Sequence, residues 1–200
     1  MKQFTTLTSK AIALPIKDID TDLIIPAQFL TRVSDAGYGD CLFRRLRDSD
    51  PNFPLNQPRY NDAEILVADD NFGCGSSREH AVWALRDGGF KVIIAKSFAD
   101  IFSGNAANNG LLLIKLAPAI IDQLMSSITS SKETLEITVN LEDQKVLSNG
   151  HSYNFDYDPF RKHCLINGLE TIDYLNAERD AISKFAERHL VEAFIPRAKN

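Results

Sequence analysis

Three continuous apolar runs, each followed by a stretch with helical character, constrain the fold of this 200-residue chain more than any other feature. The runs are AEILVADD from residue 63, KVIIAKS from residue 91 and GLLLIKL from residue 110. Strands that are apolar throughout are buried on both faces, and their alternation with helices is typical of parallel pairing. The pattern predicts an α/β fold with a mainly parallel sheet flanked by helices.

The pattern changes after residue 130, where a different kind of sheet is expected. Residues 134–158 alternate apolar and polar side chains around turn signals, as antiparallel hairpins do. Residues 168–190 read as an amphipathic helix, and its apolar stripe consists of Ile172, Leu175, Ile182 and Phe185. With no internal repeat, residues 1–200 are predicted to form a single domain with a smaller antiparallel part and a helical extension over about 168–200.

The segment before the first apolar run is expected to hold strands, turns and short helices. Residues 4–16 read as one or two strands, and residues 38–47 look helical. The aspartates of DIDTD alternate as in a calcium loop, but Leu23 and Phe29 stand where that loop needs Gly and Glu, so calcium is rejected. The default interpretation is a turn in which Asp22 or Thr21 caps the next short helix.

The stretch NFGCGSSREHA, residues 71–81, is the candidate functional motif. A dinucleotide-binding loop would need a glycine at Arg78, and a P-loop would need a lysine that is absent. Neither Ser76 nor Ser77 has the Gly-x-Ser-x-Gly frame of a nucleophile elbow. All three familiar motifs are therefore rejected.

What remains at this stretch is a site for an anion. It follows a predicted parallel strand, at the edge where open α/β sheets place their ligands. The N–H groups at the start of the next helix and the guanidinium of Arg78 favour a carboxylate or phosphate. The same residues also fit a capping box, with Ser76 as the cap of a helix over about 77–86 and Glu79 reaching back. A cap and a ligand site are compatible, and both interpretations stay open.

Charge and cysteine usage exclude several function classes. The net charge of −5 leaves no basic excess for nucleic acid. No apolar run is long enough for a signal peptide core or a membrane span, so no membrane association is expected. Cys41, Cys74 and Cys164 form no CxxC pair, which argues against a structural zinc site or a disulfide framework and predicts no metal on this chain. Reduced thiols predict a cytoplasmic protein.

Three motifs in order, DIDTDLIIPAQFL, GCGSSREHA and AKSFADIFSGNAANNGLL, carry a resemblance to a known family. Over essentially all 200 residues the chain resembles the small subunits of 3-isopropylmalate dehydratase (isopropylmalate isomerase), the swivel-domain part of the aconitase superfamily. The resemblance implies a leucine-biosynthesis hydro-lyase that isomerises 2-isopropylmalate through isopropylmaleate. It implies that this chain binds no cofactor, that a [4Fe–4S] cluster belongs to a large subunit, and that the chain is active only with that partner.

The resemblance also implies roles for individual residues. Ser76 would be the base that removes the carbon-bound proton, and Arg78 with Ser77 would bind a carboxylate of the small dicarboxylate substrate. Asp22 would orient groups near the site. Arg32 is matched to a second substrate-binding arginine.

Substrate choice is expected to depend on two features. Gly-Cys-Gly is associated with the isopropylmalate branch, so Cys74 is predicted to contact a substrate with an apolar tail. Residues 32–53 are expected to form a lid near the alkyl group, with Tyr38, Leu42 or Phe43 in contact. Two alternatives stay open: a related citraconate/methylmalate hydro-lyase subunit, and an anion-binding module without catalysis.

Overall fold

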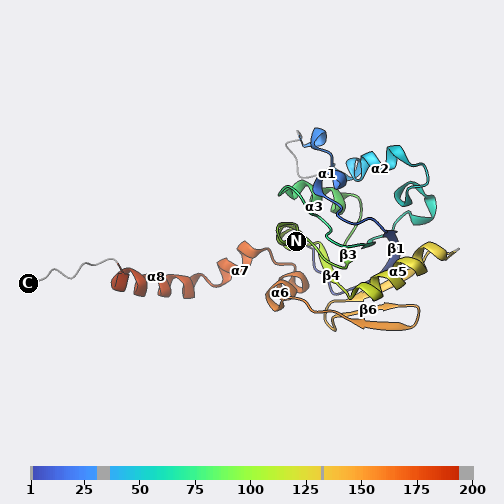
Figure 1. Ribbon diagram of the computed structural model, residues 1–200. Coiled ribbons are helices and arrows are strands. Elements are labelled where there is room, and N and C mark those ends of the chain that lie inside the picture. The colour runs from blue at the N-terminus through green and yellow to red at the C-terminus, as the bar shows by residue number, and fades with distance from the viewer. Residues whose placement is uncertain (1, 31–36, 132, 194–200) are drawn as a thin grey trace, which may run out of the picture.

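The computed structural model describes residues 2–30, 37–131 and 133–193, and its centre is a seven-stranded sheet in the order β4-β3-β2-β1-β5-β6-β7 (Figure 1). The parallel half consists of β1 (Thr6–Leu14), β2 (Ile65–Ala68), β3 (Val92–Ala95) and β4 (Leu112–Lys115). The antiparallel half adds β5 (Glu136–Asn140), β6 (Lys145–Ser148) and β7 (His151–Asn154). The predicted α/β class, with a mainly parallel sheet and a smaller antiparallel part, is confirmed.

Strand β1 joins the two halves because its two ends pair with different neighbours. Its C-terminal residues 11–14 pair in parallel with β2, whereas residues 6–10 pair antiparallel with β5. The three predicted apolar runs became β2, β3 and β4, and every residue of β2 and β3 is fully buried. Complete burial requires covered faces on both sides, which explains the absence of polar alternation in these runs.

Helices supply that cover. The three longest in this half are α3 (Glu79–Asp87), α4 (Asp100–Asn108) and α5 (Pro118–Ser130). Figure 1 shows α3 and α5 on opposite sides of the strands, and α5 contacts β1 and β2 while α4 contacts β4. The apolar face of α5 buries Ile121, Leu124, Met125 and Ile128, at helical spacing.

Short helices fill the connection from β1 to β2. Helix α1 (Thr21–Ile24) is followed by a 3₁₀ turn at Ala27–Phe29. The prediction that Asp22 or Thr21 caps α1 is wrong, because the cap is Asp20, whose carboxylate accepts a hydrogen bond from the Leu23 N–H at 2.6 Å. Asp20 precedes Leu23 by three residues, which is the spacing between a capping side chain and the N–H group that it accepts from.

The expected helix over residues 38–47 is divided in two. A 3₁₀ turn covers Gly39–Cys41, helix α2 covers Arg44–Ser49, and Phe43 between them has a φ of 50°. Two further 3₁₀ turns, Pro54–Asn56 and Pro58–Tyr60, follow in the proline-rich loop.

The C-terminal part differs from the single predicted helix. Helix α6 (Pro159–Asn167) ends at Gly168, and α7 (Thr171–Ala177) and α8 (Arg179–Ala193) extend away from the sheet (Figure 1). The four residues of the predicted apolar stripe are 46–58% exposed. None of the helices in the described part of the chain is long and apolar enough to cross a membrane.

Candidate functional site

The glycine loop lies between two chain segments that continue from neighbouring strands of the sheet. Phe72 forms a parallel bridge with Phe98, which follows β3, and Cys74 forms one with Asp20, which follows β1. The Gly73 N–H donates to the carbonyl of Ile19 at 2.7 Å. The loop is thus an extension of β2 at the carboxyl edge of the parallel sheet, where ligands of this fold class bind.

Close packing explains the first glycine. Gly73 has a φ of +79°, and a Cβ atom there would lie 2.3 Å from Cγ of Phe102. The segment after it is more open, since Gly75, Ser76 and Ser77 are exposed. Packing on Phe102 therefore fixes the start of the loop, and the two serines are presented at its free end.

The two serines and Arg78 line a cavity of about 240 Å³. Its wall is completed from α1, the glycine loop and the start of α4, by Thr21, Gly73, Gly75, Ala99, Asp100, Ile101 and Phe102. The Ser76 carbonyl accepts a hydrogen bond from Oγ1 of Thr21 at 2.9 Å, and neither serine hydroxyl bonds to any described residue. The backbone of Ser76 is thus fixed while its Oγ stays available.

The predicted capping box is wrong. Helix α3 begins at Glu79, its cap is Arg78, and no side chain caps it. Glu79 instead accepts a hydrogen bond from the Asn109 amide at 2.6 Å, and the same amide accepts one from the Trp83 indole at 3.0 Å. Because no side chain occupies the start of α3, its first N–H groups can serve an anion together with Arg78.

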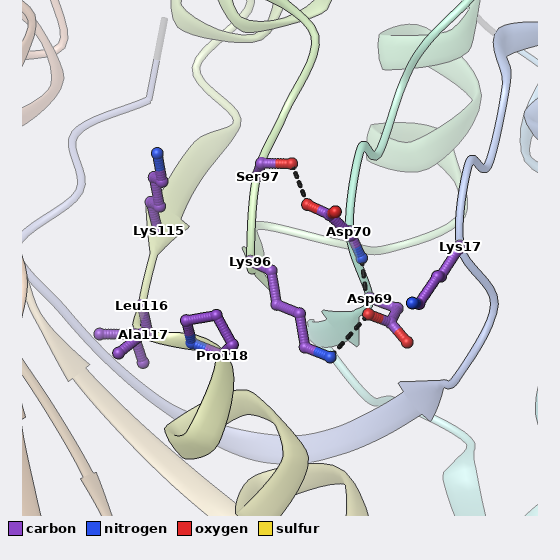
Figure 2. Close-up of a pocket in the computed structure, with 9 residues that line it drawn as sticks. All are labelled: Lys17, Asp69, Asp70, Lys96, Ser97, Lys115, Leu116, Ala117 and Pro118. Carbon is purple, nitrogen blue, oxygen red and sulfur yellow. Dashed lines mark hydrogen bonds and ion pairs between the residues drawn. The ribbon is translucent and has the colours of Figure 1, made fainter.

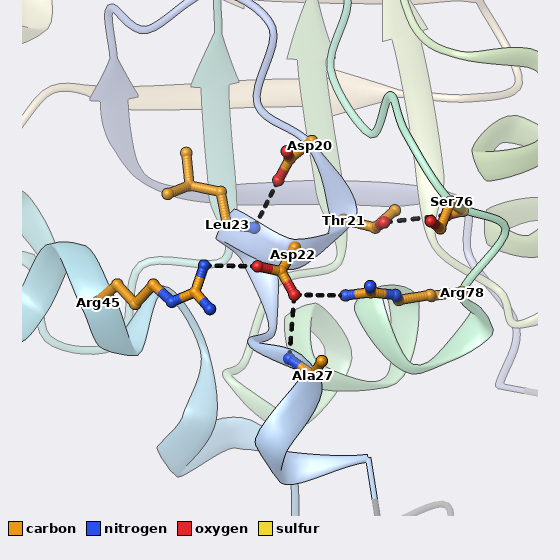
Figure 3. A network of polar contacts seen from close by, with 8 residues as sticks. All are labelled: Asp20, Thr21, Asp22, Leu23, Ala27, Arg45, Ser76 and Arg78. Atoms are coloured by element: carbon orange, nitrogen blue, oxygen red, sulfur yellow. Dashed lines mark hydrogen bonds and ion pairs between the residues drawn. The ribbon is translucent and has the colours of Figure 1, made fainter.

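The structure brings Asp22 and Arg78 together in an ion pair. Nη1 of Arg78 lies 2.7 Å from Oδ1 of Asp22, and the Ala27 N–H donates to the same oxygen at 3.0 Å (Figure 3). The other oxygen, Oδ2, accepts from Arg45 at 2.5 Å. These partners, Arg78 foremost, hold the pKa of Asp22 below its usual value against the opposing effect of burial.

Sequence reasoning missed Arg45 and Thr21 as parts of this arrangement. Arg45 is one of three arginines within four positions, and nothing in that run distinguishes it. The sequence indicates Thr21 only as a possible helix cap, although Thr21 lies in the same motif as Asp22.

Cys74 does not line the cavity. Cys74 is half-buried between the two glycines, and burial, together with the charges of Asp20 and Asp18, raises the pKa of its thiol, so it stays protonated at neutral pH. The predicted contact of Cys74 with substrate therefore remains a prediction. Arg32 lies outside the described residues.

The side chains expected to contact an alkyl group belong to the core instead. Tyr38, Leu42 and Phe43 are each at most 1% exposed. The ring of Tyr38 packs edge-on against His80 at a centroid distance of 5.5 Å. These three side chains therefore belong to the core and do not line the cavity beside the glycine loop.

A larger cavity of about 590 Å³ lies further along the same sheet edge (Figure 2). Lys96 reaches from the end of β3 to Asp69 at 2.8 Å and to Asp122 at 2.6 Å, and these carboxylates raise its pKa. Ser97 donates to Asp70. Asp69 and Asp122 thus pair with Lys96, and the lining also includes Asp70, Lys17 and Lys115, so the charges around this cavity are mixed.

Neither cavity contains a set of metal ligands. Within residues 2–30, 37–131 and 133–193, no three His, Cys, Asp or Glu side chains are grouped closely enough to hold a metal ion. The three cysteines are unpaired, and two of them are buried. What the glycine-loop cavity offers is two free hydroxyls, a guanidinium and a helix start, which together suit a carboxylate.

Comparisons with known proteins agree with this arrangement. Residues 1–119 match the family described as the aconitase C-terminal domain. A 3-isopropylmalate dehydratase small subunit of Francisella tularensis subsp. novicida is 52% identical over 187 residues, covering 94% of this chain and 98% of that protein. One of Ruegeria sp. is 48% identical over 194 residues, covering 94% and 96%. The crystal structure of a 3-isopropylmalate dehydratase from Methanocaldococcus jannaschii is similar with a TM-score of 0.66 and 27% identity, covering 90% of this chain and 98% of that one.

Proposed function

Because this chain belongs to the family of 3-isopropylmalate dehydratase small subunits, we propose that it supplies one half of the active site of that hydro-lyase. The observation that carries the proposal is the cavity in which Ser76, Ser77 and Arg78 meet at the carboxyl edge of the sheet. The substrate would be 2-isopropylmalate, converted to 3-isopropylmalate through isopropylmaleate.

The family description as a small subunit implies a large-subunit partner. We propose that the partner covers the open side of the cavity and carries the [4Fe–4S] cluster, which supplies Lewis acidity toward the leaving hydroxyl. The described residues of this chain offer no ligand set for such a cluster, and the cavity offers hydroxyl and guanidinium groups instead. The cluster therefore suits the partner's side of the site.

Ser76 is the proposed base. Its Oγ would take the proton from the substrate carbon next to the one that loses the hydroxyl, and the electron pair of the broken C–H bond would form the double bond. A serine alkoxide needs strong stabilisation, which the start of α3 and the guanidinium of Arg78 can provide once water is excluded. The hydrogen bond from Thr21 to the Ser76 carbonyl holds the backbone in place for this role.

Arg78 and Ser77 are the proposed carboxylate ligands. A guanidinium presents several N–H groups, so Arg78 can keep its bond to Asp22 and still bind a substrate carboxylate. We keep Arg32 as the proposed second substrate arginine and Cys74 as a proposed determinant of the apolar tail. We also propose that residues 1–200 form a single functional domain with an extension from about residue 168. The proposed location is the cytoplasm.

Reconstitution tests the role of Ser76. The purified chain is mixed with its cognate large subunit, in which the cluster has been reconstituted, and isopropylmaleate is detected by its ultraviolet absorbance. Isopropylmaleate should form only when both chains are present. Ser76→Ala should lower kcat by about three orders of magnitude or more, because the base is lost while the carboxylate ligands remain. Ser126→Ala, an exposed serine on α5, is the matched control and should leave the rate unchanged.

Other outcomes would contradict this role. Activity of the large subunit alone, or full activity with Ser76→Ala, would show that Ser76 is not the base. A complex that binds dicarboxylates but never turns them over would favour an anion-binding module. Faster turnover of methylmalate than of isopropylmalate would assign the chain to the related citraconate hydro-lyases.

A further inference from the structure

The carboxylate of Asp22 lies between two guanidinium groups that come from different parts of the chain. Figure 3 shows Arg78 and Arg45 approaching it from opposite sides, Arg78 from the glycine loop and Arg45 from α2. Arg78 binds Oδ1 at 2.7 Å and Arg45 binds Oδ2 at 2.5 Å. Each oxygen of one carboxylate therefore holds a different arginine.

The position of Arg45 is determined by constrained backbone. Two residues earlier, Phe43 has a φ of 50°, a strained conformation for a bulky side chain, and it is fully buried. Its N–H donates to the carbonyl of Ile24, the last residue of α1, at 2.8 Å. This bond ties the start of α2 to the helix that carries Asp22, so Arg45 and Asp22 are held in a fixed relation.

The other arginines of α2 are engaged elsewhere. Arg44 pairs with Asp48 at 2.9 Å on the exposed side of the helix, and Nε of Arg47 donates to Asn56 at 3.2 Å. Among the three, Arg45 alone reaches Asp22 within the described part of the chain. Its neighbour Arg44 therefore provides a control with the same charge on the same helix.

Two partners on opposite oxygens restrict the rotation of a carboxylate. If Arg45 were absent, Asp22 would keep its bonds on Oδ1 but lose the one on Oδ2, and its plane could turn. Arg78 would then lose a fixed acceptor, and the direction of its remaining N–H groups toward the cavity would no longer be defined.

We propose that Arg45 is a positioning residue for substrate binding, acting through Asp22 to hold the guanidinium of Arg78 in the orientation that accepts a substrate carboxylate. The inference rests on the proposed function and adds a residue to the same site. Arg45 would not touch the reacting atoms; it would set the geometry of the group that binds substrate.

The reconstituted two-chain enzyme tests the proposal at a saturating concentration of large subunit. Arg45→Gln should raise KM for isopropylmalate about tenfold and change kcat by less than about twofold. The reason is that the contact between Arg78 and the substrate carboxylate would be weakened equally in the ground state and in the transition state. Arg45→Lys keeps the charge and one donor and should recover most of the loss. Arg44→Gln should match the unaltered enzyme in KM and kcat.

Asp22→Asn separates positioning from direct binding. In that background, Arg45→Gln should change the affinity for isopropylmaleate, measured by titration calorimetry, by less than about twofold, because the link to Arg78 is already lost. An undiminished effect would show that Arg45 binds substrate directly and would overturn the proposal. An unchanged KM for Arg45→Gln, in an enzyme whose unaltered form is active, would also overturn it and leave the proposed function intact.

Folding and assembly are checked independently. Thermal unfolding of Arg45→Gln and Arg44→Gln should agree within about 2 °C, since both remove an exposed charge pair. If Arg45→Gln weakened only the affinity between the two chains and left KM unchanged, Arg45 would be an interface residue and the positioning role would be wrong. An enzyme inactive in its unaltered form would instead contradict the proposed function.

Discussion

At the scale of single residues, the glycine loop depends on the absence of a side chain at Gly73. The residue combines a φ of +79° with a neighbour, Phe102, that leaves no space for a Cβ atom. Either feature alone disfavours other residues, and together they make glycine necessary there. The position of Ser76, three residues further on, depends on this packing.

Replacing that glycine should cost more than the backbone strain alone. Gly73→Ala is expected to lower the free energy of unfolding by more than about 2 kcal/mol, because strain and steric overlap with Phe102 add. Gly150 is the matched control, because it has a φ of +76° but no atom within 4 Å of the place where a Cβ would lie. Gly150→Ala should cost only about 1 kcal/mol. Equal costs in urea unfolding would show that Phe102 yields to the added methyl group.

A role in the candidate site could be predicted from the sequence only for residues that belong to a local motif. A glycine loop after an apolar run predicts an anion site at Ser76, Ser77 and Arg78, and the structure brings these three residues to one cavity. The ion pair of Asp22 with Arg78 spans 56 positions, and only the family resemblance placed the two residues in one site. Arg45 had neither a local motif nor a resemblance to single it out.

At the scale of elements, helix α1 shows how local competition decides a cap. Asp18, Asp20 and Asp22 alternate along the chain, and each has a side chain able to cap a helix. In the structure Asp20 caps α1, Asp18 accepts a hydrogen bond from the Asn71 amide at 2.7 Å, and Asp22 binds the arginines. The three aspartates thus have three different partners, which the alternation alone did not reveal.

Loss of the cap should be measurable although α1 has only four residues. Asp20→Ala is expected to lower the free energy of unfolding by about 1 kcal/mol, because the Leu23 N–H loses its acceptor. Asp20→Asn keeps an acceptor at the same place and should lose less than half as much. Chemical unfolding of both variants provides the comparison, and equal losses would point to the charge of Asp20 rather than the cap.

Helix α3 illustrates a local signal that tertiary contacts overrode. The capping-box spacing from Ser76 to Glu79 is present in the sequence, but Glu79 bonds to Asn109 at the end of α4 instead. The helix therefore begins two residues later than predicted, and Ser76 is left free for another role. A partner 30 positions away cannot be inferred from a four-residue pattern.

At the scale of the whole molecule, the C-terminal helices differ from the rest of the chain. Residues 179–189 of α8 are all exposed, whereas the preceding α6 buries Cys164 and Leu165, and the carbonyl of Leu165 accepts a hydrogen bond from the N–H of Phe4 at 2.9 Å. Helix α6 therefore belongs to the packed domain. The side chains of residues 179–189 of α8, by contrast, do not belong to the buried core.

Truncation should separate these two contributions. Removing residues 178–200 is expected to change the melting temperature by no more than about 2 °C, because the described side chains of α8 are all exposed. Removing residues 159–200 should lower it by several degrees, because Leu165 and its hydrogen bond to the segment before β1 are lost. Calorimetric scans of the isolated chain measure both. A large loss on the shorter truncation would show that α8 does contribute to the stability of the domain.

The α/β class and the order of the strands along the chain could be predicted from the sequence alone, because they depend on periodicity and on neighbouring residues, and the same local pattern indicates where the candidate anion site lies. The pairing of β1 with both β2 and β5, the true start of α3 and the union of Asp22 with Arg45 and Arg78 were decided only by the tertiary structure. Each of these involves partners far apart in the chain, whose meeting depends on how whole elements pack.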